Sequence, residues 1–222
     1  MSDLVRLWGV LLGTFIGLLP IVDPLTAAPT FLAITEGQSE ERRREQARRG
    51  CLYMVAILVS FLVGGRFIMN FFGISIPGLR IAGGILLTGL GMEMLTAHQT
   101  GILANPAERE AARRKGDISF SPLAMPMLSG PGSIAVTIGF TSLATGWIDY
   151  VAIIAGIVAM ASLTYIVLRI SSRGVKLLGP IGVDALTKTM GFLTMCIGVQ
   201  FVVNGVLDPE LLRRFRAGLS SG

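Results

Sequence analysis

The sequence predicts an all-α, polytopic membrane protein with six transmembrane helices, arranged as two inverted three-helix repeats with broken first and fourth helices. Three observations predict this fold class: the composition, the prolines inside two apolar blocks, and an internal similarity at an offset of 107 residues. Of the 222 residues, 52% are hydrophobic and 15% are charged, and the mean hydropathy is +0.69. Because the apolar residues form long unbroken blocks, they fit bilayer spans better than amphipathic helices of a soluble domain.

Six blocks are present, and we expect one membrane crossing for each. They cover Leu4–Ile34, Gly50–Phe72, Gly78–Leu95, Ser121–Leu143, Trp147–Ile170 and Val183–Leu207. As one straight helix the first block would extend roughly 46 Å, whereas the hydrocarbon core is about 30 Å thick. Since this block contains Pro20, Pro24 and Pro29, we expect a broken helix. Both a kinked span and a re-entrant hairpin fit the break.

Basic residues divide unevenly between the loops, with twelve on one side of the predicted membrane and five on the other. The twelve are Arg42, Arg43, Arg44, Arg48, Arg49, Arg109, Arg113, Arg114, Lys115, Arg169, Arg173 and Lys176, and the five are Arg6, Arg80, Arg213, Arg214 and Arg216. The positive-inside rule therefore predicts cytoplasmic arginine-rich loops and both termini outside.

The internal similarity divides one membrane domain, 1–222, into repeat one (1–98), a cytoplasmic loop (99–118), repeat two (119–208) and a tail (209–222). At the offset of 107, Asp23–Ala28 falls on Gly130–Ala135, and the later matches are Thr30 with Thr137, Gly84 with Gly191, Gly91 with Gly198, and Glu93 with Gln200. Because each repeat has three spans, the two copies must cross the membrane in opposite directions. Inverted repeats with interrupted helices are typical of secondary transporters, whose substrate site lies near the midplane.

Each break is expected to start a new half-helix inside the membrane. Asp23 is a good N-cap and Pro24 fits the first helical position, and Gly130 with Pro131 repeats this arrangement. A helix start presents unpaired N–H groups and the positive end of the helix dipole. Such groups are tolerated at this depth only where they are buried in protein or line a wet cavity.

Hydroxyl side chains follow each break by about one turn, and they complete the candidate substrate site. Thr26 and Thr30 share one helix face, as do Ser133 and Thr137. With the two caps and their prolines, these residues suit a small anionic group such as the carboxylate of an amino acid.

Three residues are candidates for a coupling ion or a substrate pathway: Asp23, Glu93 and Gln200. A carboxylate at membrane depth is costly and marks a functional site more often than not. The structural alternatives are that Asp23 acts only as an N-cap and that Glu93 reaches solvent.

No metal or cofactor site is predicted, because Cys51, Cys196 and His98 form no ligand set with suitable spacing. The arginines lie between apolar blocks, which indicates membrane topology and not a nucleic-acid surface. The motifs of zinc proteases, serine hydrolases and P-loop ATPases are absent, so neither an enzyme nor an ATP-driven pump is expected.

Three segments together resemble the MarC family of inner-membrane proteins, in order and spacing, along nearly the whole chain: Ile21–Leu32, Ala82–Leu95 and Pro122–Ser133. The resemblance implies a six-span membrane protein and transport of small neutral amino acids. The family usually has Asn-Pro where this chain has Asp23-Pro24, so this chain carries an additional protonatable group.

We therefore expect a secondary transporter of small neutral amino acids or similar small zwitterions in the inner membrane. Its expected partners are the small-molecule substrate, the lipid bilayer, and H⁺ or Na⁺ as coupling ion. Two alternatives stay open: an intramembrane enzyme acting on lipid-linked or phosphorylated substrates, and a non-transporting membrane scaffold.

Overall fold

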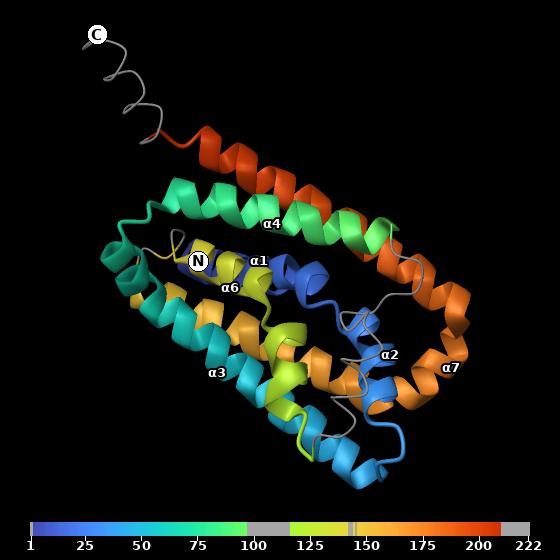
Figure 1. The fold of residues 1–222 in the computed structure, drawn as a ribbon. Helices are drawn as coiled ribbons and strands as arrows, with labels where there is room; N and C mark the ends of the chain where they lie inside the picture. The colour runs from blue at the N-terminus through green and yellow to red at the C-terminus, as the bar shows by residue number, and fades with distance from the viewer. Residues whose placement is uncertain (1, 97–115, 142–143, 145, 210–222) are drawn as a thin grey trace, which may run out of the picture.

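The computed structural model describes residues 2–96, 116–141, 144 and 146–209, and none of these residues lies in a strand. In chain order the helices are α1 (Ser2–Val22), α2 (Pro24–Ile34), α3 (Glu40–Phe72), α4 (Ile76–Thr96), the π-helix η1 (Ser119–Leu128), α6 (Pro131–Phe140) and α7 (Trp147–Val206) (Figure 1). Most of the predicted loop 99–118 and of the predicted tail 209–222, together with His98, lies outside the described residues.

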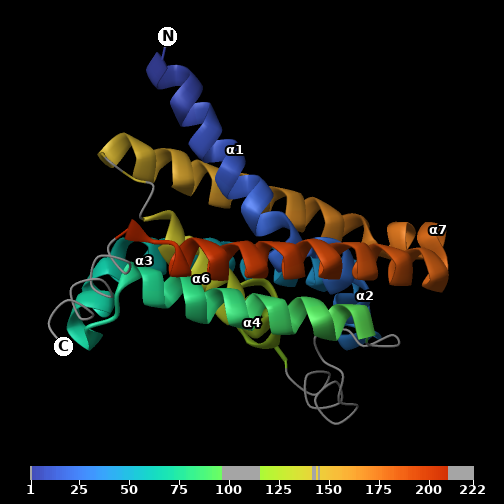
Figure 2. The same cartoon turned by 90° about the horizontal axis from the view of Figure 1, so that it is seen from above.

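The predicted all-α membrane fold is confirmed. Within the described residues, five segments are long and apolar enough to cross a membrane: Val5–Val22, Glu40–Phe72, Ile76–Thr96, Trp147–Ser172 and Ile181–Val206. η1 and α6, bent by 63° at their junction, pass the same test when taken together, and they form either a sixth, broken span or a re-entrant loop. The last two segments belong to the 60-residue helix α7, which breaks at Gly179, where φ is 64°. The views in Figures 1 and 2 show the two halves of α7 folded back as a hairpin.

Helix α3 begins ten residues before the apolar block that predicts it. Ser39 caps this helix by accepting a hydrogen bond from the Arg42 N–H at 3.3 Å. The charged first turns are stabilised by i,i+4 ion pairs, such as Arg49 Nε to Glu45 Oε1 at 2.7 Å. Hydropathy alone locates the membrane-spanning part of this helix and misses its polar extension.

The helix ends fall into two groups at opposite ends of the molecule (Figures 1 and 2). The start of α1, the α3–α4 connection, the end of α6 and both ends of α7 lie together. At the other end lie the end of α2, the start of α3 and the break in α7. Arg42 of α3 donates to the Gly116 carbonyl at 2.5 Å, which brings the start of η1 to this second end as well. The grouping agrees with the predicted loop sides, and which end faces the cytoplasm stays a prediction.

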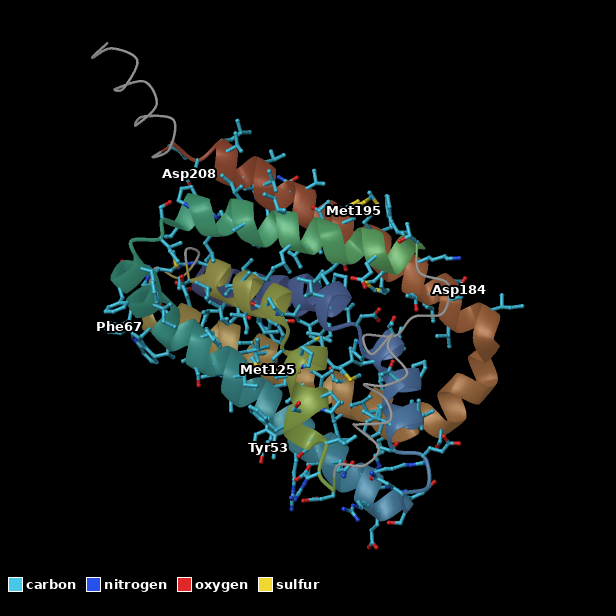
Figure 3. The ribbon with its side chains drawn as sticks, viewed as in Figure 1. Tyr53, Phe67, Met125, Asp184, Met195 and Asp208 are labelled. Carbon is cyan, nitrogen blue, oxygen red and sulfur yellow. The ribbon has the colours of Figure 1, made fainter. Side chains whose placement is uncertain are left out.

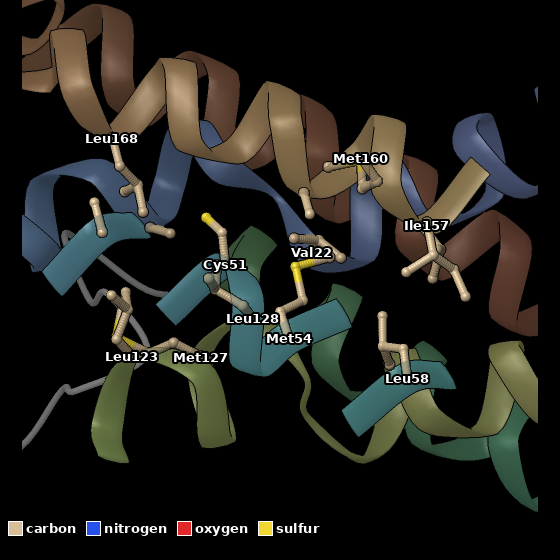
Figure 4. Close-up of a cluster of buried hydrophobic side chains, with 14 of the residues drawn as sticks. Val22, Cys51, Met54, Leu58, Leu123, Met127, Leu128, Ile157, Met160 and Leu168 are labelled. Atoms are coloured by element: carbon tan, nitrogen blue, oxygen red, sulfur yellow. The ribbon is translucent and has the colours of Figure 1, made fainter. Parts of the chain in front are cut away.

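The hydrophobic core surrounds the two interrupted spans. Val22, the last residue of α1, and Leu128, the last residue of η1, are fully buried in one cluster with Met54 of α3 (Figure 4). Ile157 and Met160 of α7 belong to the same cluster. The chain therefore changes direction twice inside its hydrophobic core.

Glycines allow α4 and the C-terminal half of α7 to pack in close contact, side by side and antiparallel (Figures 1 and 2). A Cβ built on Gly84 would lie 2.5 Å from the Gly198 carbonyl oxygen, and one built on Gly91 would lie 2.6 Å from the Gly191 carbonyl oxygen. These distances leave no room for a side chain. Gly84 and Gly91 therefore allow the two helices to pack in close contact.

We expect Gly84→Ala to destabilise the protein by about 1–3 kcal/mol, because the new methyl group would force the two backbones apart. Gly89→Ala in the same helix is the matched control, since a Cβ at Gly89 would meet nothing within 4 Å. Thermal unfolding in detergent measures the difference. Equal melting temperatures for the two variants would contradict the close packing of α4 on α7.

Candidate functional site

The first break is centred on Asp23, which is confirmed as the N-cap of α2. Its backbone is left-handed, with φ 36° and ψ 74°, a conformation in which Asp is enriched among non-glycine residues. The side chain accepts a hydrogen bond from the Thr26 N–H at 3.3 Å and another from the Thr26 hydroxyl. Asp23 is 4% exposed. The start of α2 is therefore filled by the protein's own carboxylate.

Pro24 removes the N–H that would otherwise bond to the Pro20 carbonyl in a continuous helix. The hydroxyl of Thr194, from the C-terminal half of α7, donates to this carbonyl at 2.8 Å. A second threonine of the same helix, Thr187, lies 3.0 Å from the Thr26 hydroxyl oxygen. The sequence analysis did not select either threonine. Their seven-residue spacing puts them on one face of an apolar span, and this pattern could have indicated a polar contact with another helix.

The second break has the same framework with a different cap. Gly130 is the N-cap of α6 and Pro131 is the first helical residue, as predicted. A Cβ on Gly130 would lie 2.8 Å from the Pro126 carbonyl oxygen, so the close approach of that backbone favours glycine. Without a side chain, this cap cannot bond to the helix start. Within the described part of the chain, the N–H groups of Gly132 and Ser133 have no hydrogen-bond acceptor.

Ser129, directly before this cap, is fully buried, and its hydroxyl has no hydrogen-bond partner among the described residues. A buried polar group without a partner costs about 1–3 kcal/mol, so it needs an explanation. Ser129 lies three and four residues before two N–H groups that also lack an acceptor, and all three groups are donors of the kind that an anion accepts. Sequence reasoning did not select Ser129.

The predicted hydroxyl residues are all buried beside the breaks. Ser133 donates to the Leu128 carbonyl at 3.3 Å, and Thr137 donates to the Ser133 carbonyl at 2.7 Å. The Thr30 side chain is 3% exposed and makes no hydrogen bond to any described residue. Thr137 is therefore engaged within its own helix, whereas Thr30 has an available hydroxyl.

The two breaks are neighbours in the structure. A Cβ on Gly132, in the first turn of α6, would lie 3.4 Å from the Ile21 side chain, two residues before Asp23. Helix α1 also packs on α6, and α2 packs on η1. The predicted substrate residues therefore come from two adjacent helix starts in one buried region.

Glu93 and Gln200 lie elsewhere, on exposed faces of α4 and α7. The Gln200 amide donates to the Asn204 side chain at 2.8 Å. Their assignment to a coupling ion or a pathway stays a prediction. Among the described residues, no group of three His, Cys, Asp or Glu side chains could hold a metal ion.

We expect Thr194→Val to destabilise the protein by about 1–3 kcal/mol, because it leaves the Pro20 carbonyl buried without a donor. Thr189→Val is the control, since this exposed threonine bonds only to the Ala185 carbonyl of its own helix, at 2.8 Å. Thermal unfolding of both variants tests the contact. A Thr194→Val protein as stable as the control would show that the first break does not depend on α7.

Comparisons with known proteins agree on one family. The model of a family described as MarC family integral membrane protein matches residues 8–209. The chain is 37% identical, over 201 residues, to the UPF0056 inner membrane protein MarC of Salmonella paratyphi A and to that of Citrobacter koseri, covering 86% of this chain and 91% of each relative. The protein of the same name from Escherichia coli O1:K1 is 36% identical with the same coverage. No solved structure matches the chain.

Proposed function

The chain belongs to the MarC family of integral membrane proteins, and we propose that it is a secondary transporter of small neutral amino acids or similar small zwitterions. It is a multi-pass protein of the inner membrane, as the names of its relatives and its apolar helices indicate. The proposed orientation has both termini outside and the arginine-rich loops in the cytoplasm.

The observation that carries the proposal is the difference between the two helix starts. At α2 the Asp23 carboxylate bonds to the helix N-terminus, whereas at α6 the equivalent position is a glycine and the N–H groups of Gly132 and Ser133 are open. The carboxylate of a substrate would take at α6 the place that Asp23 takes at α2. The Ser129 and Ser133 hydroxyls would add donors, and the dipole of α6 favours a negative charge there.

The inverted repeat is part of this proposal, and the glycine contacts support it. Gly84 packs on Gly198, and Gly91 packs on Gly191. The offset of 107 residues relates the two pairs, because Gly84 corresponds to Gly191 and Gly198 corresponds to Gly91. Two antiparallel copies related by a two-fold axis would produce such an exchange, and this architecture recurs in secondary transporters.

Substrate counterflow in proteoliposomes tests the proposal, with glycine, alanine or serine as the trapped solute and its labelled form outside. Wild type should exchange at least one of them saturably. Ser129→Ala and Ser133→Ala should each raise the half-saturating concentration about tenfold, as expected for the loss of a hydrogen bond to a charged group. Ser129→Ala should also unfold at the same or a higher temperature than wild type, because it removes an unsatisfied buried hydroxyl.

Ser162→Ala is the control for this experiment, since the exposed Ser162 bonds only to the Val158 carbonyl of its own helix. No exchange of any of the three amino acids by folded protein would reject the transport of small amino acids. In that case another solute, an intramembrane reaction or a scaffold role would have to explain the site. If the Ser129→Ala protein were less stable than wild type but exchanged substrate normally, the Ser129 hydroxyl would have a structural role and not a role in binding.

Asp23→Asn tests whether the buried carboxylate responds to a coupling ion. Asparagine also caps helices and tolerates the left-handed conformation, so the variant should fold. Exchange by wild type at pH 5.5 and 7.5 should differ, and the variant should lose that difference because it has no group to protonate. An unchanged pH dependence in Asp23→Asn would remove this residue from coupling.

A further inference from the structure

A cavity lies at the opposite end of α6 from its cap. It has a volume of about 350 Å³ and opens where the last residues of α6, the first turns of α4 and the end of α7 meet. We call it the Arg80 pocket. Its polar side chains are Arg80, Asn204 and Asp208, and Phe140, Phe201 and Leu207 supply apolar surface. Figure 3 shows Asp208 at the end of α7, next to the start of α4.

The pocket contains one positive and one negative side chain, which form an ion pair and are partly buried. Arg80 Nη1 lies 3.0 Å from Asp208 Oδ2, and the two side chains are 23% and 18% exposed. A guanidinium and a carboxylate thus stand side by side, with the Asn204 amide on the same wall. The volume falls near the lower limit of ligand pockets, which hold about 300–1,000 Å³.

We infer that the Arg80 pocket is a second binding site for a small zwitterion, on the route to the helix start at Gly130. The carboxylate of the ligand would bind Arg80, its ammonium group would bind Asp208, and its side chain would contact Phe140, Phe201 and Leu207. When the ligand enters, Arg80 would pair with its carboxylate and Asp208 with its ammonium group, so neither protein charge would be left unpaired. This inference rests on the proposed function.

The position of the pocket supports a place on the same route. Helix α6 has ten residues and therefore extends about 15 Å from its cap to its end. Gly139 and Phe140, at that end, line the pocket. Gln200, a predicted pathway residue, bonds to Asn204 on the pocket wall. One short helix therefore joins the two sites.

Equilibrium binding of labelled glycine, alanine and serine to the purified full chain tests the inference. Wild type should bind two equivalents of the exchanged amino acid. The double variant Arg80→Gln/Asp208→Asn, which removes both charges together, should bind one. Asn204→Trp, which fills the mouth of the pocket and leaves the ion pair in place, should also bind one. Ser133→Ala should weaken the other equivalent about tenfold.

Arg6→Gln/Asp149→Asn is the matched control, because Arg6 and Asp149 form another arginine–aspartate pair, with Nη2 and Oδ2 2.6 Å apart, outside the Arg80 pocket. This variant should keep two equivalents. The second site would be overturned if wild type bound one equivalent of the amino acid and the double variant and Asn204→Trp bound the same amount. The proposed function would then still stand. If Arg6→Gln/Asp149→Asn lost as much binding as Arg80→Gln/Asp208→Asn, the second site would also be overturned, because the effect would not be specific to this pocket. No binding by folded wild type would reject the proposed function together with this inference.

Discussion

A proline inside a membrane span leaves a backbone carbonyl without its donor, and the packing of this protein is organised around that constraint. In the hydrocarbon region no water is available to satisfy such a group. The Pro20 carbonyl accepts the Thr194 hydroxyl, so the sixth span must lie against the first break. The close contact of α4 with the C-terminal half of α7, made possible by glycines, then fixes α4 beside the same region. The position of a single proline thus constrains two helices whose contacting residues, Pro20 and Thr194, are 174 residues apart in the chain.

The two breaks meet the constraint differently, and that difference creates the candidate site. Asp23 fills the start of α2 with a carboxylate, which leaves that helix end satisfied without a ligand. At α6 the Pro126 carbonyl approaches Gly130 too closely for a Cβ. The cap is therefore bare, and the N–H groups behind it stay open. Buried polar groups without a partner are uncommon and need an explanation, and the proposed substrate carboxylate at α6 would supply one.

Much of the fold follows from the sequence, because bilayer spans and proline breaks leave strong local signals. The apolar blocks predicted the membrane helices, and Asp23-Pro24 and Gly130-Pro131 predicted both helix starts. Hydropathy did not locate two local features, and it gave no information on which helices meet. The polar turns of α3 from Glu40 onward carry no hydropathy signal, and the distortion of η1 comes from extended backbone at Ser121 and Met125, each before a proline. The roles of Thr194, Ser129 and the Arg80–Asp208 pair depend on which helices meet, which one sequence does not specify.

The polarity of α6 indicates how two sites along one helix could work in sequence. Its N-terminal end favours a carboxylate, whereas its C-terminal end favours a cation. At the C-terminal end the Arg66 guanidinium bonds to the Thr141 carbonyl at 3.4 Å, and Arg80 lies in the pocket beside it. In the proposed second site, a ligand carboxylate held by Arg80 would compete with Asp208 for the same guanidinium, so re-formation of the ion pair would favour release of the ligand. Passage requires sites that bind well enough to fill and weakly enough to empty. In the proposed transport sequence, an ion pair that re-forms as the ligand leaves would meet this requirement at the Arg80 pocket, and the open N–H groups of Gly132 and Ser133 would then receive the carboxylate.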